Sequence, residues 1–226
     1  MGAIGLFQRV FYIALLAGLC AGTVAWAARQ IGTVPLIQQA ETYEQAAAPG
    51  HDHNAEGWQP AEGLERTLFT LAADVLTGIA FALLLGAALI ISGVIIDWRA
   101  GVVWGLAGFA VFSLAPALGL PPDLPGTEAA ALHARQLWWL ATAALTAAGL
   151  ATARFAPHRA WLIAAAALIA LPHIIGAPQP DTHQHAAPDA LARQFVIAVL
   201  LTNAVFWVAL GAMTGFLHQR AGFQRG

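Results

Sequence analysis

The chain has 226 residues, of which 59% are hydrophobic and only 10% are Asp, Glu, Lys or Arg, and its mean hydropathy is +0.67. An ordinary globular domain carries about 25% charged residues, so the composition excludes a water-soluble protein and indicates an integral membrane protein. The net charge is -2, and all ten basic residues are arginines, so we expect membrane lipid around the chain and no nucleic-acid partner. The lone Cys20 excludes an intrachain disulfide, and we expect its thiol to be packed in the interior.

Six apolar segments approach the roughly 20 residues that a membrane-spanning helix needs. The fourth and fifth are short, and Pro172 is expected to end the fifth early. We therefore predict an all-α, polytopic membrane helix bundle with six transmembrane helices, or five if one short segment does not cross. The whole chain, residues 1–226, would form one integral membrane domain. The six segments are residues 10–28, 68–96, 100–120, 137–153, 161–175 and 195–213.

The charged residues give the orientation of these segments. With the N-terminus inside, six arginines fall on the inner side and four on the outer side, as the positive-inside rule favours. Ten of the twelve acidic residues then lie in three outer loops. The longest of these, residues 29–66, is acidic, contains histidine and has strong helix breakers in its middle. We expect it to be a mobile outer loop and expect both termini in the cytoplasm.

Pairs of glycines four residues apart occur in three of the apolar segments. Small residues at this spacing let membrane helices approach closely. We therefore expect close helix contacts at these pairs, which are Gly18 with Gly22, Gly101 with Gly105 and Gly211 with Gly215.

Six of the eight histidines fall in outer loops or at an outer helix end under this topology. Four of them form two His-x-His pairs, whose rings point the same way when the backbone is extended. Neutral imidazole suits borderline divalent metals such as cobalt, nickel, copper and zinc, so we predict exchangeable metal capture outside the membrane. Solvated polar loop residues would show the same pattern. The six are His51, His53, His133, His173, His183 and His185.

A stiff loop follows the third apolar segment, because three prolines between 121 and 125 fix the backbone there. It carries Asp123 and Glu128, and His133 follows. A tryptophan pair, 138–139, then returns the chain to the membrane interface. We predict that these polar residues form the mouth of a metal pathway. A helix connector with an aromatic anchor is the alternative.

Asp74 is the ionisable residue inside an apolar segment. Such a group costs on the order of 2.5–3.5 kcal/mol on insertion scales, so it normally faces a cavity or a partner. Asn203 lies in the sixth segment at a depth similar to that of Asp74, and Thr142 and Thr146 lie in the fourth segment. We predict that these four line a transport path. A single interhelical hydrogen bond, such as one from a threonine to Asp74, is the alternative.

Two longer stretches resemble a known family. They are GLPPDLPGTEAAALHARQLWWLATAALTAAGL and PHIIGAPQP, and with LFQRVFYIALLAGLCAGTV the similarity covers nearly the whole chain. The chain resembles the predicted cobalt transporter subunit family CbtA, which is usually described with five spans. On this resemblance, the motif residues Asp123 and His173 can coordinate metal, whereas the others shape the backbone. Those others are Leu120, Pro121, Pro122, Leu124, Pro125, Gly126, Pro172, Gly176, Ala177 and Pro178.

The resemblance implies a multi-pass protein of the bacterial inner (cytoplasmic) membrane that supplies cobalt for cobalamin synthesis. It also implies a small single-span partner, CbtB, with a histidine-rich end. We expect Co²⁺ to be the transported ion and expect no cofactor and no enzymatic activity, since no nucleophile–base pair stands out. Three alternatives stay open: an accessory metal-binding subunit that does not conduct, transport of nickel or another divalent metal, and a haem-bearing membrane anchor. Whether the chain forms an oligomer is also left open by the sequence.

Overall fold

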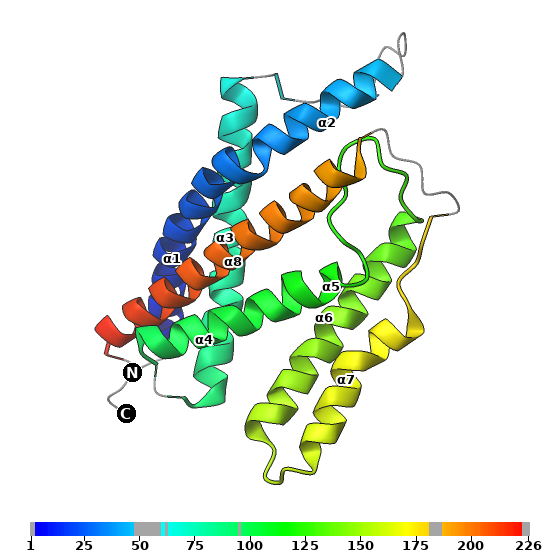
Figure 1. Ribbon diagram of the computed structural model, residues 1–226. Helices are drawn as coiled ribbons and strands as arrows, with labels where there is room; N and C mark the ends of the chain where they lie inside the picture. The colour runs from blue at the N-terminus through cyan, green and yellow to red at the C-terminus, as the bar shows by residue number, and fades with distance from the viewer. Residues whose placement is uncertain (1–2, 48–59, 62, 95, 181–186, 223–226) are drawn as a thin grey trace. The chain divides into compact units, whose positions relative to one another are not determined.

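A computed structural model describes residues 3–47, 60–61, 63–94, 96–180 and 187–222. Within these residues the protein is helical and has no strand. Figure 1 labels the helices. Their bounds are α1 (Ala3–Gly32), α2 (Val34–Ala47), α3 (Leu64–Ser92), α4 (Trp98–Phe109), the π-helical turn η1 (Ala110–Leu114), α5 (Ala115–Ala117), α6 (Leu132–Phe155), α7 (Trp161–Ile175) and α8 (Asp189–Arg220).

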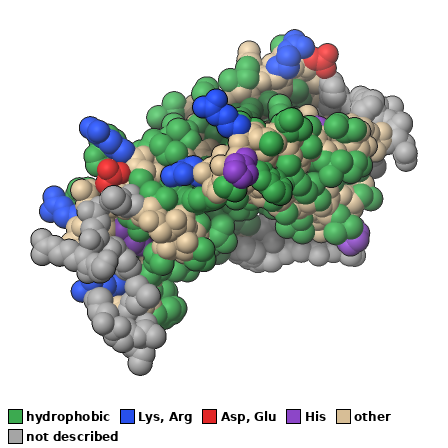
Figure 2. All heavy atoms as spheres, turned by 90° about the horizontal axis from the view of Figure 1, so that it is seen from below, with side chains coloured by type: hydrophobic (Ala, Val, Ile, Leu, Met, Phe, Trp, Pro, Cys, Tyr) green, Lys and Arg blue, Asp and Glu red, His purple; other side chains and the backbone are tan. Residues whose placement is uncertain are grey.

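Helix accounts for most of each of the six apolar segments, so the all-helical membrane fold is confirmed. Four helical stretches among the described residues are long and apolar enough to cross a membrane: Phe7–Gly32, Leu64–Ser92, Trp98–Ala117 and Asp189–Arg220. The helix α7 is apolar but shorter. Hydrophobic side chains are widespread on the face drawn in Figure 2, and many large ones are exposed, such as Ile31, Ile91 and Ile174. Exposed apolar side chains of this kind are expected where a protein meets lipid. A count of six spans stays a prediction.

Two expectations were wrong. The outer segment 29–66 begins with helix, because α1 continues to Gly32 and α2 follows as far as Ala47. The reason is an apolar face at helical spacing: Leu36, Ile37 and Ala40 all pack into a core cluster. Cys20 is exposed rather than packed, because it points away from the glycine face of α1 that meets α3.

Backbone contacts divide the chain into two compact units. Unit 1 comprises Met1–Thr33, Pro49–Leu106 and Leu201–Gly226, and unit 2 comprises Val34–Ala48 and Ala107–Leu200. The helices α1 and α3 belong to unit 1, α2, α6 and α7 belong to unit 2, and α4 and α8 each contribute to both.

In unit 1, α1 and α3 run antiparallel with their backbones in contact. Gly22 meets α3 so closely that a Cβ there would lie 2.6 Å from the Asp74 carbonyl oxygen. One turn along α1, Gly18 faces Gly78 of α3 in the same way. Only glycine permits this approach, so the expectation drawn from the first glycine pair is confirmed.

The two other glycine pairs meet each other in unit 1. Gly101 and Gly105 of α4 lie against Gly211 of α8, and a Cβ on Gly211 would be 2.9 Å from the Gly105 Cα. Gly215 continues the seam beyond Gly101. Since the residue numbers rise along α4 as they fall along α8, these helices are also antiparallel.

The start of α1 and the end of α8 lie together. The guanidinium of Arg9 donates a hydrogen bond of 3.0 Å from Nη1 to the carbonyl oxygen of Ala221. A helix end leaves such carbonyls without intrahelical donors, so Arg9 satisfies one of them. The expected placement of both termini on one side agrees with this contact, whereas the compartment stays a prediction.

Unit 2 contains a hairpin of α6 and α7. Trp138 near the start of α6 donates a hydrogen bond to the carbonyl of Pro172 near the end of α7. Eleven residues further along α6, a Cβ on Gly149 would lie 2.8 Å from the carbonyl oxygen of Ala165. These two contacts fix an antiparallel register. They place Thr142 and Thr146 between them on α6.

Candidate functional site

A cavity of about 230 Å³ lies in unit 2, between the loop that precedes α6 and the segment that follows α7. The two segments that enclose it are the ones that carry the resemblance described above, GLPPDLPG and GAPQP. Its polar walls come mainly from Asp123, Glu128 and Arg135. The full lining is Gly119, Leu120, Pro121, Asp123, Thr127, Glu128, Ala129, Ala130, Arg135, Pro178, Gln179 and Pro180.

The loop is held in place by a small apolar core. Leu124 is buried and packs in one cluster with Ala40 of α2 and with Leu191 and Phe195 of α8, all within unit 2. The turn after it is closed at Gly126, whose φ of +75° favours glycine. With Leu124 anchored and prolines on both sides, Asp123 has little freedom to leave the cavity wall.

The charges of this cavity are two carboxylates and one guanidinium. Partial burial raises the pKa of Asp123 above its ordinary value, and the positive charge of Arg135 lowers it in part. Asp123 and Glu128 remain exposed enough to meet solvent. Carboxylate oxygens bind hard and borderline divalent cations, so the cavity can attract a hydrated metal ion.

Trp138 connects the cavity loop to the hairpin. A Cβ on Gly119 would lie 2.6 Å from Cζ2 of the Trp138 ring, so that glycine makes room for the indole. The indole Nε1 donates to the Pro172 carbonyl at 3.2 Å, and the His173 ring stands edge-on at a centroid distance of 5.8 Å. The Nε2 atom of His173 is buried and has no hydrogen-bond partner among the residues described.

Two threonines of α6 carry hydroxyls that their own helix does not use. Thr23, Thr67 and Thr70 each donate to a carbonyl four residues earlier, which is the usual fate of a helical hydroxyl. In contrast, the hydroxyls of Thr142 and Thr146 are buried without a partner in the described part of the chain. A buried, unpaired hydroxyl is costly, so these two oxygens are candidates to bind a water or a cation.

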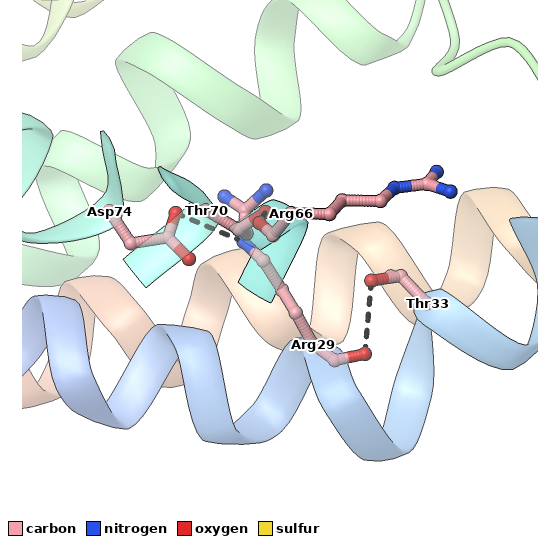
Figure 3. A network of polar contacts seen from close by, with 5 residues as sticks. All are labelled: Arg29, Thr33, Arg66, Thr70 and Asp74. Carbon is pink, nitrogen blue, oxygen red and sulfur yellow. Dashed lines mark hydrogen bonds and ion pairs between the residues drawn. The ribbon is translucent and has the colours of Figure 1, made fainter. Parts of the chain in front are cut away.

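Asp74 in unit 1 has a charged partner that the sequence did not suggest. Its Oδ1 lies 3.4 Å from Nε of Arg29 on α1, and Figure 3 shows the two side chains pointing toward each other across the helix pair. The side chain of Asp74 is 10% exposed and that of Arg29 is 42% exposed. An ion pair with Arg29 therefore stands where the alternative interpretation expected a hydrogen bond from a threonine, and the transport path stays a prediction.

The predicted site residues are only partly brought together. Asp123 and Glu128 line one cavity, whereas His133 is exposed in the first turn of α6 and His173 lies against Trp138. Asn203 is half-buried on α8 in unit 1. The two His-x-His pairs, His51 with His53 and His183 with His185, lie outside the described residues. Within the described ranges no three His, Cys, Asp or Glu side chains group as a metal site.

Three charged residues near these sites were missed by the sequence reasoning. Arg135 follows His133 by two residues, a spacing that places it elsewhere on α6. Glu44 of α2 lies beside the loop turn, where a Cβ on Gly126 would be 3.4 Å from its Cδ. Arg29 could not be assigned from the sequence, because its approach to Asp74 depends on the register of α1 against α3, which the contact of Gly22 with Asp74 and Val75 sets.

Comparison with protein families gives one match. The model of the family described as "Probable cobalt transporter subunit (CbtA)" matches residues 7–219. Searches of curated proteins and of solved structures found no match. The family match covers the glycine seams, the cavity loop, the α6–α7 hairpin and the Arg29–Asp74 pair, so the chain belongs to the CbtA family of probable cobalt transporter subunits.

Proposed function

We propose that this protein takes up Co²⁺ across the bacterial inner membrane for cobalamin synthesis, together with a small single-span subunit of the CbtB kind. The family description supports a cobalt transporter subunit. The word "subunit" supports a partner. In the mature complex Co²⁺ is the cargo, and the chain supplies the groups that attract and pass it.

The observation that carries this proposal is the cavity beside Asp123 and Glu128. Six water molecules occupy about 180 Å³ at roughly 30 Å³ each, and the cavity measures about 230 Å³. A divalent ion therefore fits with its first hydration shell intact. The two carboxylates would hold it through its waters, so capture at this point needs no dehydration.

Further groups would then replace the water shell. In unit 2 these are the unpaired Nε2 of His173 and the hydroxyls of Thr142 and Thr146. In unit 1 they are Asp74 and Asn203. Outside the described residues, His51, His53, His183 and His185 would collect metal from solution as neutral imidazoles. His133 lies exposed at the start of α6 and would serve the same capture step.

One observation favours a second candidate, an accessory subunit that binds metal and hands it to a conducting partner. Conduction needs a site that strips water from the ion, and the described ranges contain no group of three or more metal-binding side chains. In that case the partner would supply the missing ligands.

The test is cobalt uptake into reconstituted vesicles, with this chain alone and with its partner, in competition with nickel and zinc. We expect uptake to require a higher cobalt concentration for half-saturation when Asp123→Asn and Glu128→Gln are combined. Glu65→Gln, an acidic residue that does not line the cavity, is the matched control. Uptake only with the partner would favour the accessory subunit, and absence of uptake in both cases would overturn the proposal.

A further inference from the structure

The ion pair between Arg29 and Asp74 leaves its charged atoms poorly satisfied. The single contact is 3.4 Å between Nε and Oδ1, whereas strong charge-assisted hydrogen bonds are about 2.7–2.9 Å. Asp74 Oδ2 and Arg29 Nε are both buried and make no hydrogen bond with any residue that the structure describes. One oxygen of a carboxylate that is nine-tenths buried therefore lacks a partner, and a ligand would reach it if Arg29 moved aside.

The pair is also not needed to hold α1 against α3. The backbones of these helices already touch at Gly18 and Gly22, where any Cβ would collide with α3. Such close packing is the main source of helix association in lipid. A loose salt bridge added at the end of this seam contributes little adhesion, so its role is to neutralise the carboxylate rather than to hold the two helices together.

Arg29 is placed to leave Asp74. Its side chain is 42% exposed and sits in the last turn of α1, so the guanidinium can move outward along its flexible stem. Arg66 precedes Asp74 by about two turns on α3, and Figure 3 shows its side chain extending away from the carboxylate. Arg29 is therefore the guanidinium that occupies the carboxylate in this arrangement.

We propose that Arg29 is a tethered cation that occupies Asp74 in the metal-free protein and that an arriving divalent cation displaces. This inference rests on the proposed function and adds the group that controls when Asp74 accepts an ion. At the same distance, the Coulomb attraction of a divalent ion to the Asp74 carboxylate is about twice that of the guanidinium. The attraction of a monovalent ion equals that of the guanidinium, so such an ion has no advantage over Arg29. The exchange would therefore admit divalent ions, keep the carboxylate neutralised when none is bound, and exclude Na⁺ and K⁺.

The test compares Co²⁺ binding to the full-length protein in lipid nanodiscs with Co²⁺ uptake into vesicles. Arg29→Gln removes the competitor, and we expect Co²⁺ to bind more tightly, by on the order of 5- to 150-fold, the common range for coupling between two binding events. Arg66→Gln removes a nearby positive charge from α3 and leaves the Arg29–Asp74 pair intact. For this control we expect the Co²⁺ affinity to change by less than about twofold. In the double variant Arg29→Gln with Asp74→Asn, we expect the tighter Co²⁺ binding of the single Arg29→Gln variant to be lost.

A charge swap separates the proposed exchange from a structural salt bridge. The variant Arg29→Asp with Asp74→Arg restores the pair, and we expect it to insert and remain folded but to take up no Co²⁺. Uptake at the normal rate by this variant, or unchanged Co²⁺ affinity in Arg29→Gln, would overturn the exchange. If the original chain binds Co²⁺ with the expected changes but transports none, the exchange stands and the proposed uptake function fails.

Discussion

The hydrogen bond from Trp138 to Pro172 should set the stability of the α6–α7 hairpin, and Trp138→Phe tests it. The substitution keeps an aromatic ring at this position, but it removes the indole N–H and the distal ring atoms that lie beside Gly119. The Pro172 carbonyl also accepts the N–H of Gly176 at 3.1 Å, so it is not left unsatisfied. The hydrogen bond then contributes its net value of about 0.5–1.5 kcal/mol rather than the larger penalty of an orphaned acceptor, and the packing lost with the smaller ring is measured by the control below.

For a chain of this size, 1 kcal/mol corresponds to a shift of about 2–4 °C in Tm. We therefore expect Trp138→Phe to lower the Tm of the detergent-solubilised protein by about 1–6 °C more than the control substitution in a thermal unfolding assay. Trp139→Phe is the matched control, because the neighbouring indole packs on Phe112 at 6.1 Å between ring centroids. The reasoning would be refuted if the Tm fell as much in Trp139→Phe as in Trp138→Phe, or if it fell in neither variant.

Three further predictions follow from the seams, the histidines and the chain ends. Gly101→Val should abolish the folded protein in a size-exclusion assay of the extracted membrane fraction, because its side chain would collide with the α8 backbone, whereas Gly5→Ala, with no atom within 4 Å, should not. A tag after Gly226 should resist labelling from outside the cell, and labelling there would reverse or recount the spans. Replacing the four His-x-His histidines together should raise the external Co²⁺ needed for half-maximal uptake and leave the maximal rate near normal, and an unchanged dose response would remove the capture hypothesis. Those four are His51, His53, His183 and His185.

The sequence predicted the helices because burial in lipid forces every backbone amide to be paired within its own segment. It also predicted the glycine seams, since Gly101 and Gly211 have no other use in a membrane helix. The sequence did not indicate α2, because the strong breakers in the middle of residues 29–66 outweigh the helical spacing of Leu36, Ile37 and Ala40 before them. That spacing was visible in the sequence.

The contents of the candidate sites were harder to predict. Asp123 and Glu128 could be placed in one loop from the prolines between and beside them, but the other wall of the cavity comes from residues 178–180, over 50 positions away. The partner of Asp74 depends on how far α1 slides along α3. That register is set by the contact of Gly22 with Asp74 and Val75, which sequence spacing alone does not fix.

The contact between Arg9 and Ala221 has a consequence for how the chain could be cut and rejoined. A short linker could join the first and last described helices covalently where they already touch. New ends could then be opened in the turn between α6 and α7, at residues 156–160, with every helix pair kept. Correct insertion of such a circular permutant would show that the bundle does not depend on the order in which its helices leave the ribosome.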